Sequence, residues 1–481
     1  MNERRRAWNA EGADWIGRDR PRGAVPKLTA ISTDRRPGPS AVSPGIDMKE
    51  QSGQMNASAL HASDDATQPA PLRGAAFVLA WVTLTPFQSL QSSGLLAVTS
   101  GNKAMMYVAF AALAAGAAAL AGPRLRHLLP CLRPWPIPAL GGWLLVTSLL
   151  SQDPSASIRA LALTTILVTL AGCLWLMPRD QRELATLLAA ATGIVLALSY
   201  GGVLVAPELT IHQAMDTLEP QLAGDWRGVF GHKNDAAAMF SLFVFIGLFV
   251  ARSGLRLAGT AIALAAALFV LNAGGKSALM LVVASFFVGL AWEAMRSRPL
   301  RIALALAPLA VLLTVGIGSV LVPALAGFTR ALPVDASFTG RTDIWEFAVD
   351  KLNGHLATGY GFQAFWNTEA TRFGSDEDGW AGTAAHAHNG YLDMVVNMGL
   401  PGLALVLVVF VAMPMRDFLA AERRGADPAL TLMLLQVWLF GLYLSAVETF
   451  LFLLANAIWV TFLFAVLGLR VAACHRLKGR G

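Results

Sequence analysis

The feature that most constrains this chain is a succession of apolar runs, each about 20 residues long. A run of that length crosses the hydrocarbon core of a bilayer as a helix. The 481 residues are 55% hydrophobic and only 14% charged, with a mean hydropathy of +0.54, whereas globular chains carry about 25% charged residues. A soluble enzyme is therefore excluded. The sequence predicts an all-α polytopic membrane protein.

Twelve candidate spans follow one another from Gly74, with mostly short connections. They lie near residues 74–91, 104–121, 136–151, 158–177, 184–206, 234–251, 256–273, 277–295, 301–322, 389–414, 429–447 and 450–471. The chain thus divides into spans 1–9 (74–322), a long loop (323–388), and spans 10–12 with a short tail (389–481).

The first 73 residues differ from the rest. They contain no apolar run and are rich in Arg, Pro, Ser, Ala and Asp, a composition that buries no core and lacks the apolar stretch of a secretory signal. We expect residues 1–73 to be a disordered cytoplasmic tail, with Met48 and Met55 as alternative translation starts. Cys131, Cys173 and Cys474 are far apart and predict neither a disulfide framework nor a metal site.

Positive charge is distributed unevenly between the two sets of connections. One side holds most of the basic residues: Arg124, Arg126, Arg133, Arg179, Arg182, Arg252, Arg256, Arg296, Arg298, Arg301, Arg416, Arg423, Arg424, Arg470, Arg476 and Lys478. Outside the long loop, the opposite side holds few: Lys103, Arg159, Arg227, Lys233 and Lys276. Because cytoplasmic loops carry the excess of Lys and Arg, both termini are predicted to be cytoplasmic and loop 323–388 to face outward. This scattered charge does not indicate nucleic-acid binding.

The long loop contains the sequence Gly340-Arg341-Thr342-Asp343-Ile344-Trp345-Glu346. Asp343 and Glu346 have the spacing of a capping box, which predicts a helix that begins at Asp343 with Arg341 just ahead of it. Such an N-terminus attracts anions, and an arginine beside it adds a bidentate phosphate ligand. Alternatively, Arg341 is a surface residue paired with Asp335 or Asp343.

A second cationic segment, Trp226-Arg227-Gly228-Val229-Phe230-Gly231-His232-Lys233-Asn234, lies at the outer mouth of span six. Its two cations and His232 can meet a phosphate from the bilayer side. Interfacial anchoring explains Trp226 and Lys233 equally well, but it explains Arg227 less well. Lys276, in the turn between spans seven and eight, is a minor candidate contact for a lipid phosphate or an anchor. Residues 272–277 lack the first glycine of a P-loop, so no nucleotide site is predicted.

The loop closes with His386-Ala387-His388-Asn389-Gly390. Asn389, Asp393 and Asn397 recur every four residues and form a polar stripe on one helix face, and Gly399 and Pro401 end this short helix before the span proper. His388 at its start can accept a proton from a substrate hydroxyl. A structural histidine is the alternative, especially for His386. No third ligand has a convincing spacing, so no metal site is predicted.

Together these motifs resemble the bacterial O-antigen ligase and polysaccharide polymerase superfamily. The family signature of His-Asn, nine residues and Gly-x-x-Gly is matched by His388-Asn389 and by Gly399-Leu400-Pro401-Gly402. The stretches 340–345 and 359–362 look like the family's long-loop pattern, and 227–234 is similar to the segment before the sixth span of exopolysaccharide polymerases. The resemblance extends from about Gly74 to the C-terminus.

This resemblance implies an inverting glycosyltransferase of the bacterial inner membrane with a periplasmic active face and neither metal nor other cofactor. Its donor would be an undecaprenyl-pyrophosphate-linked glycan, and its acceptor a lipid-linked glycan or lipid A-core. Arg341 and Arg227 would hold the donor pyrophosphate, assisted by Lys233 and Lys276, and His388 would orient or deprotonate the acceptor. Asn389, Asp393, His386 and His232 would support them. Membrane lipids and a chain-length regulator protein are the other expected partners.

Three other functions stay open. A ligase would transfer the finished glycan to lipid A-core, although the similarity of residues 227–234 favours an exopolysaccharide polymerase. A transporter or flippase also fits twelve spans, but transporter sites lie near the bilayer midplane, whereas these cations gather in outer loops. A structural scaffold would not need Arg341 and His388.

Overall fold

The structure is a computed structural model that describes residues 70–87, 100–215, 219–331, 338, 340–366, 384–453 and 456–475. Most of the predicted tail, residues 1–69, lies outside the described residues. Within them the chain is helical, and its β-structure is a single bridge between Ile211 and Trp226. The all-α prediction is confirmed.

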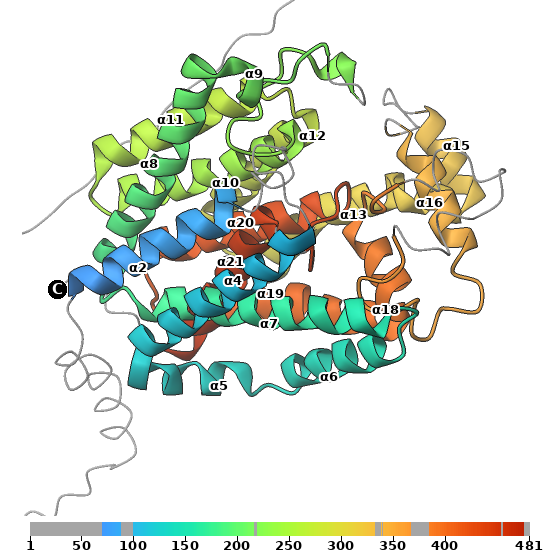
Figure 1. Ribbon diagram of the computed structural model, residues 1–481, viewed down its shortest axis with the longest axis horizontal. Helices are drawn as coiled ribbons and strands as arrows, with labels where there is room; N and C mark the ends of the chain where they lie inside the picture. Colours follow the sequence, from blue (N-terminus) through green and yellow to red (C-terminus); the bar gives the residue numbers. More distant parts are fainter. Residues whose placement is uncertain are drawn as a thin grey trace, which may run out of the picture. The chain divides into compact units, whose positions relative to one another are not determined.

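The helices of the membrane region follow the order of the predicted spans (Figure 1). They are α2 (Ala70–Val82), α4 (Ser100–Ala121), α6 (Pro136–Leu149), α7 (Pro154–Leu176), α8 (Gln181–Val205), α10 (Lys233–Arg252), α11 (Arg256–Asn272), α12 (Lys276–Ala294), α13 (Arg298–Val315), α18 (Gly390–Leu407), α19 (Met413–Arg423), α20 (Pro428–Leu444) and α21 (Ala457–Cys474). Among the described residues, eight apolar helical segments are long enough to cross a membrane and four apolar helices are shorter. The chain is therefore a multi-pass membrane protein.

Short helical turns fill the remaining connections. π-Helical turns extend α2 (Thr83–Phe87) and join α18 to α19 (Val408–Ala412), and 3-10 turns lie at Gly122–His127 and Pro220–Leu222. Short α-helices follow at α5 (Leu129–Leu132), α9 (Pro207–Thr210), α14 (Ile317–Leu321), α15 (Pro323–Ala331) and α16 (Arg341–Asp350).

The apolar surface divides between an inner core and an outer, lipid-facing layer. Helices α10, α20 and α21 are buried along most of their length, whereas α13 is mostly exposed. Leucines, valines and phenylalanines point outward from peripheral helices, for example Leu198 on α8, Phe287 on α12 and Val311 on α13. Such a large exposed apolar surface is what lipid tails cover in a membrane protein.

The connections gather at two ends of the helical bundle. At one end, hydrogen bonds connect loops that are distant in the sequence. These bonds join Gln152 to Tyr360, Trp226 to Asn272, and Asn234 to Glu448. At the other end, Gln181 contacts Ser253, Arg301 pairs with Glu422, and Cys131 contacts His475. The first end carries every segment that the sequence analysis singled out, and the second carries most of the arginines.

The connection between α13 and α18 is itself partly helical. α15 and α16 lie beyond the end of α13, and α16 packs against the first half of α18 (Figure 1). The predicted capping box is wrong, because α16 begins at Arg341 rather than at Asp343. The N-cap residue is Gly340, which has a φ of +83° and no side chain that could form a hydrogen bond. The glycine backbone thus replaces the expected carboxylate cap.

The predicted break at Gly399 is confirmed. Its φ of +68° and ψ of −177° interrupt the helix from Gly390 to Leu407, a conformation that is almost restricted to glycine. A Cβ at this position would lie 2.4 Å from the carbonyl oxygen of Ala357. Gly359 has a φ of +64°, and a Cβ at this position would lie 2.4 Å from the carbonyl oxygen of Val396. The two glycines therefore bring the 356–361 segment directly against the kink.

The last span begins later than the sequence predicts. α21 starts at Ala457, and Phe450, Leu451 and Phe452 lie in the preceding loop. These three side chains are almost completely buried against the core. Their hydrophobicity therefore reflects packing of a loop, which explains why residues 450–456 resembled the start of a span.

Candidate active site

Arg341 lies at the first position of α16 and points toward the loop between α20 and α21. Its Nη2 donates to Glu448 Oε1 at 2.5 Å, and its Nη1 donates to the Val447 carbonyl. The side chains of Arg341 and Glu448 are only 17% and 18% exposed, so this ion pair is shielded from water. The partner of Arg341 is thus a residue 107 positions away. Asp335, one of the two partners considered from the sequence, lies outside the described residues.

His388 contacts the same carboxylate. Its Nδ1 lies 2.8 Å from Glu448 Oε2, and because a carboxylate only accepts hydrogen bonds, Nδ1 carries the proton. The backbone of His388 has a φ of +48°, which is uncommon outside glycine and accumulates at functional sites. Glu448 therefore joins His388 and Arg341 in one cluster.

The segment that carries His388 is held on both sides. The Ala387 carbonyl accepts from Trp345 Nε1 of α16 at 2.8 Å, and the Ala387 N–H donates to both Asp393 oxygens at 3.3 Å. Asp393 also accepts from Trp366 Nε1 at 2.6 Å and from the Thr449 hydroxyl. The Asp393 carboxylate therefore ties three segments together, and its supporting role in the reaction stays a prediction.

Asn389 fixes the start of α18. Its Oδ1 accepts from the N–H groups of Tyr391 and Leu392, and its Nδ2 donates to the Ala446 carbonyl. The Gly390 N–H donates to the Ser445 carbonyl at 2.7 Å. These bonds attach α18 to the 445–448 loop and so place Glu448 beside His388.

Two pKa shifts describe the electrostatics of the cluster. Burial would raise the pKa of Glu448, but the hydrogen bond from His388 and the charge of Arg341 outweigh it and lower this pKa to about 2. Burial and the neighbouring His388 lower the pKa of His386 to about 4. His386 is therefore neutral near pH 7, and since its Nδ1 accepts from the His388 N–H, its own proton lies on Nε2.

The cationic segment before α10 forms a second group. Lys233 Nζ pairs with Asp225 Oδ2 at 2.6 Å, and Arg227 Nε donates to the Leu209 carbonyl at 3.2 Å. His232 caps α10 through Nδ1 and faces Glu219 at 3.0 Å. Lys276 begins α12 and is exposed. Its turn packs on the same loop, because a Cβ at Gly274 would meet Asp225 at 2.5 Å.

The two groups meet at the N-terminus of α10. Lys233 belongs to the second group, while the next residue, Asn234, donates through Nδ2 to Glu448 at 3.4 Å. The structure thus brings His388, His386 and Arg341 together around Glu448, and gathers Arg227, His232, Lys233 and Lys276 around the adjoining loop. Within the described part of the chain, no three His, Cys, Asp or Glu side chains are placed to hold a metal ion.

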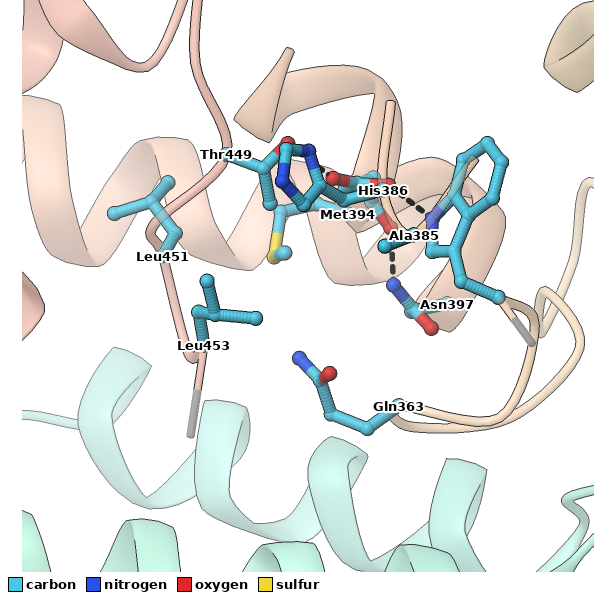
Figure 2. A pocket seen from close by; sticks show the side chains of 10 residues that line it. Gln363, Ala385, His386, Met394, Asn397, Thr449, Leu451 and Leu453 are labelled. Atoms are coloured by element: carbon cyan, nitrogen blue, oxygen red, sulfur yellow. Dashed lines mark hydrogen bonds between the residues drawn. The ribbon is translucent and has the colours of Figure 1, made fainter. Parts of the chain in front are cut away.

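A cavity of about 160 Å³ adjoins the Glu448 cluster. It lies between the first half of α18, the 363–366 segment and the 449–453 segment. Figure 2 shows His386, Met394 and Thr449 along one side, Leu451 and Leu453 along another, and Gln363 across from His386. His386 lines this cavity, and the centroid of its ring lies 4.1 Å from that of His388.

Residues 259–407 match the family model described as O-antigen ligase. This part of the chain is therefore similar to the O-antigen ligase family, and the match covers less than half of the chain. The exopolysaccharide production protein ExoQ of Rhizobium meliloti (strain 1021) is 35% identical over 82 residues, a match that spans 16% of this chain and 18% of that relative. The resemblance stated from the motifs is confirmed, although the family match is shorter than the stretch from Gly74 to the C-terminus.

The matched region contains Arg341, His388 and the kink at Gly399, but Glu448 lies beyond it. In the sequence, Glu448 is recognisable only as an acidic residue in the short connection before the last span, a position that allows pairing with a cation but does not identify the partner. Trp345 and Trp366 were not singled out either, because nothing in their spacing distinguishes a tryptophan that holds a loop from one that fills a core.

Proposed function

We propose that this protein is an inner-membrane glycosyltransferase that moves a glycan from an undecaprenyl-pyrophosphate carrier to an acceptor hydroxyl at the periplasmic face. The match of residues 259–407 to the O-antigen ligase family model supports a role as a polysaccharide polymerase or ligase. The similarity to ExoQ, whose name assigns it to exopolysaccharide production, favours a polymerase. An O-antigen ligase that uses lipid A-core as its acceptor is the alternative.

The observation that carries this proposal is the sharing of Glu448 between Arg341 and His388. Because Glu448 holds the Nδ1 proton of His388, the Nε2 lone pair is available as a base. A carboxylate that fixes the tautomer of a histidine in this way is a recurring arrangement in acyl-transfer enzymes. Here the proton would come from the acceptor hydroxyl.

Arg341 supplies the second requirement of the reaction, which is charge stabilisation on the leaving group. Its guanidinium has five N–H donors, and the bonds to Val447 and Glu448 use two of its nitrogens. The remaining donors can bind the donor pyrophosphate, where a fixed cation lowers the barrier as the phosphate–sugar bond breaks. Arg227, Lys233 and Lys276, on the adjoining loop, would hold the same pyrophosphate from the other side.

The reaction is a single displacement. The C1–O bond to pyrophosphate breaks, the acceptor oxygen forms the new glycosidic bond to C1, and the acceptor proton passes to His388 Nε2. The leaving group departs as undecaprenyl pyrophosphate. Attack from the face opposite the leaving group inverts the anomeric carbon.

A reconstituted assay tests this proposal. Purified protein in liposomes, given lipid-linked glycan extracted from a polymerase-deficient strain, should lengthen the glycan without ATP. His388→Ala should lower the rate by on the order of 10²–10⁴-fold, as is typical for loss of a general base. The matched control is His355→Ala, because His355 is a partly exposed histidine stacked on Tyr360 in the same connection.

The possible outcomes separate the candidates. Product on lipid A-core alone would identify a ligase. An unchanged rate in His388→Ala would remove His388 from the chemistry. If EDTA abolished wild-type transfer and zinc restored it, His386 and His388 would be metal ligands, and the assignment of the base would be wrong.

A further inference from the structure

The cavity beside His386 has an unsatisfied hydrogen-bond acceptor in its wall. Asn397 is only 3% exposed, and within the described residues its Oδ1 has no hydrogen-bond partner. Its Nδ2 donates to the Asp393 carbonyl at 2.9 Å, which fixes the amide orientation because a flipped amide would place two carbonyl oxygens together. A buried acceptor without a partner is costly. A ligand hydroxyl that donates a hydrogen bond to Asn397 Oδ1 would remove this cost.

The rest of the wall has the chemistry that recognises a sugar ring. Trp366, Leu451 and Leu453 offer apolar surface for the C–H face of a pyranose, and Gln363, His386 and Asn397 offer polar atoms for its hydroxyls. A mostly apolar pocket with a few convergent polar groups is typical of small-ligand sites. Gln363 has a φ of +56°, so its side chain enters the wall from a strained backbone.

Size and charge narrow the choice of ligand. The described residues that line the cavity include no lysine or arginine, so this part of the wall offers a neutral ligand the better match. Its volume of about 160 Å³ lies below the roughly 300–1,000 Å³ of sites for drug-sized ligands. The cavity therefore suits one sugar ring rather than a chain of several.

Position assigns that ring to the acceptor. The cavity is lined by His386, whose ring centroid is 4.1 Å from that of His388, the proposed base for the acceptor, whereas Arg341 is not among its described lining residues. We propose that this cavity binds the terminal sugar of the acceptor glycan, with Asn397 Oδ1 accepting from one of its hydroxyls. This inference rests on the proposed transfer reaction and locates its second substrate. Another hydroxyl of the same sugar gives its proton to His388 Nε2 while its oxygen bonds to C1 of the donor and the C1–O bond to pyrophosphate breaks.

Truncated acceptors test this assignment. Methyl glycosides of glucose, galactose and mannose are supplied to the full-length protein in liposomes at saturating lipid-linked donor, and the soluble glycan-methyl glycoside product is measured. Asn397→Leu should raise the KM for the accepted methyl glycoside about tenfold, the effect of one lost hydrogen bond. Asn397→Ala, which removes the amide without filling the space, should act in the same direction. The KM for the lipid-linked donor should stay unchanged.

Gln436→Leu is the matched control, because Gln436 is a buried amide on α20 outside this cavity. Asn397→Leu replaces an unpaired buried carbonyl by an apolar side chain, so its melting temperature should stay unchanged or rise. An unchanged or higher melting temperature would show that the loss of binding does not result from unfolding. Unchanged KM values in both Asn397 variants would overturn the proposal, and so would a rise in the donor KM alone. Wild-type transfer between lipid-linked glycans with no product on any methyl glycoside would overturn it and leave the transfer reaction standing.

Discussion

At the scale of single residues, the proposed mechanism depends on Glu448. Its carboxylate accepts from Arg341 and from His388, and these bonds hold its pKa at about 2 despite burial. A charged carboxylate requires a proton on His388 Nδ1 and leaves Nε2 free to act as a base. The state of one side chain thus determines whether the neighbouring imidazole can act.

Glu448→Gln should therefore remove activity although the side chain keeps its shape. With its carbonyl oxygen on Arg341, the glutamine presents its NH₂ to His388 Nδ1, which must then accept, so that the proton moves to Nε2. We expect kcat to fall by on the order of 10²–10⁴-fold, as when an orienting carboxylate is neutralised. Glu219→Gln is the control, since Glu219 contacts His232 at an exposed position. An unchanged kcat would contradict the proposed tautomer.

His388 and Arg341 could be singled out from the sequence because their local motifs are distinctive. Their common partner could not be identified, since Glu448 is 60 and 107 residues away from them and no local pattern reports a contact over that distance. Asn389, Asp393 and Asn397 were recognised as a stripe from their spacing. The spacing does not show that Asp393 bonds to Trp366 and Thr449, or that Asn397 lines a cavity.

At the scale of elements, the kink in α18 decides where the site lies. The helix before Gly399 carries the polar stripe, and the helix after it continues as the span. Gly399→Ala should strain the backbone by about 1–3 kcal/mol and push the new Cβ into the Ala357 carbonyl. We expect a lower melting temperature together with reduced transfer.

Gly116→Ala is the matched control for this element. Gly116 lies within α4, and a Cβ there would meet no atom within 4 Å. Alanine is favoured over glycine inside a helix, so this variant should keep or raise the melting temperature. A melting temperature for Gly399→Ala equal to that of Gly116→Ala would show that the kink tolerates a side chain.

The order and type of the elements could be read from hydrophobic runs, but two of their boundaries could not. Gly340 caps α16 through its backbone conformation, so the carboxylate spacing at Asp343 was misleading. Phe450, Leu451 and Phe452 are as apolar as a span because the loop that holds them is buried. The better signal for the last span was Asn456, which accepts hydrogen bonds from the first turn of α21.

At the scale of the whole molecule, the two sets of connections predict which end faces the periplasm. In a background without native cysteines, Ser155→Cys and Ser297→Cys form a matched pair, because both serines are exposed and lie at opposite ends. Positive charge at the Ser297 end predicts a cytoplasmic location. An impermeant thiol reagent applied after permeabilisation of the outer membrane should label Ser155→Cys and spare Ser297→Cys. Labelling of Ser297→Cys alone would place the site in the cytoplasm.

Orientation and chemistry are tested together by the fate of the donor in cells. If the protein transfers glycan at the outer face, His388→Ala should cause undecaprenyl-pyrophosphate-linked glycan to accumulate on the periplasmic leaflet, because delivery of the donor across the membrane precedes this step. The measurement is oxidation of the accumulated glycan by impermeant periodate in spheroplasts, with His355→Ala as the control. Most of the glycan in His388→Ala cells should be oxidised if transfer occurs at the outer face, whereas glycan that stays protected on the cytoplasmic leaflet would contradict this function and favour a transporter.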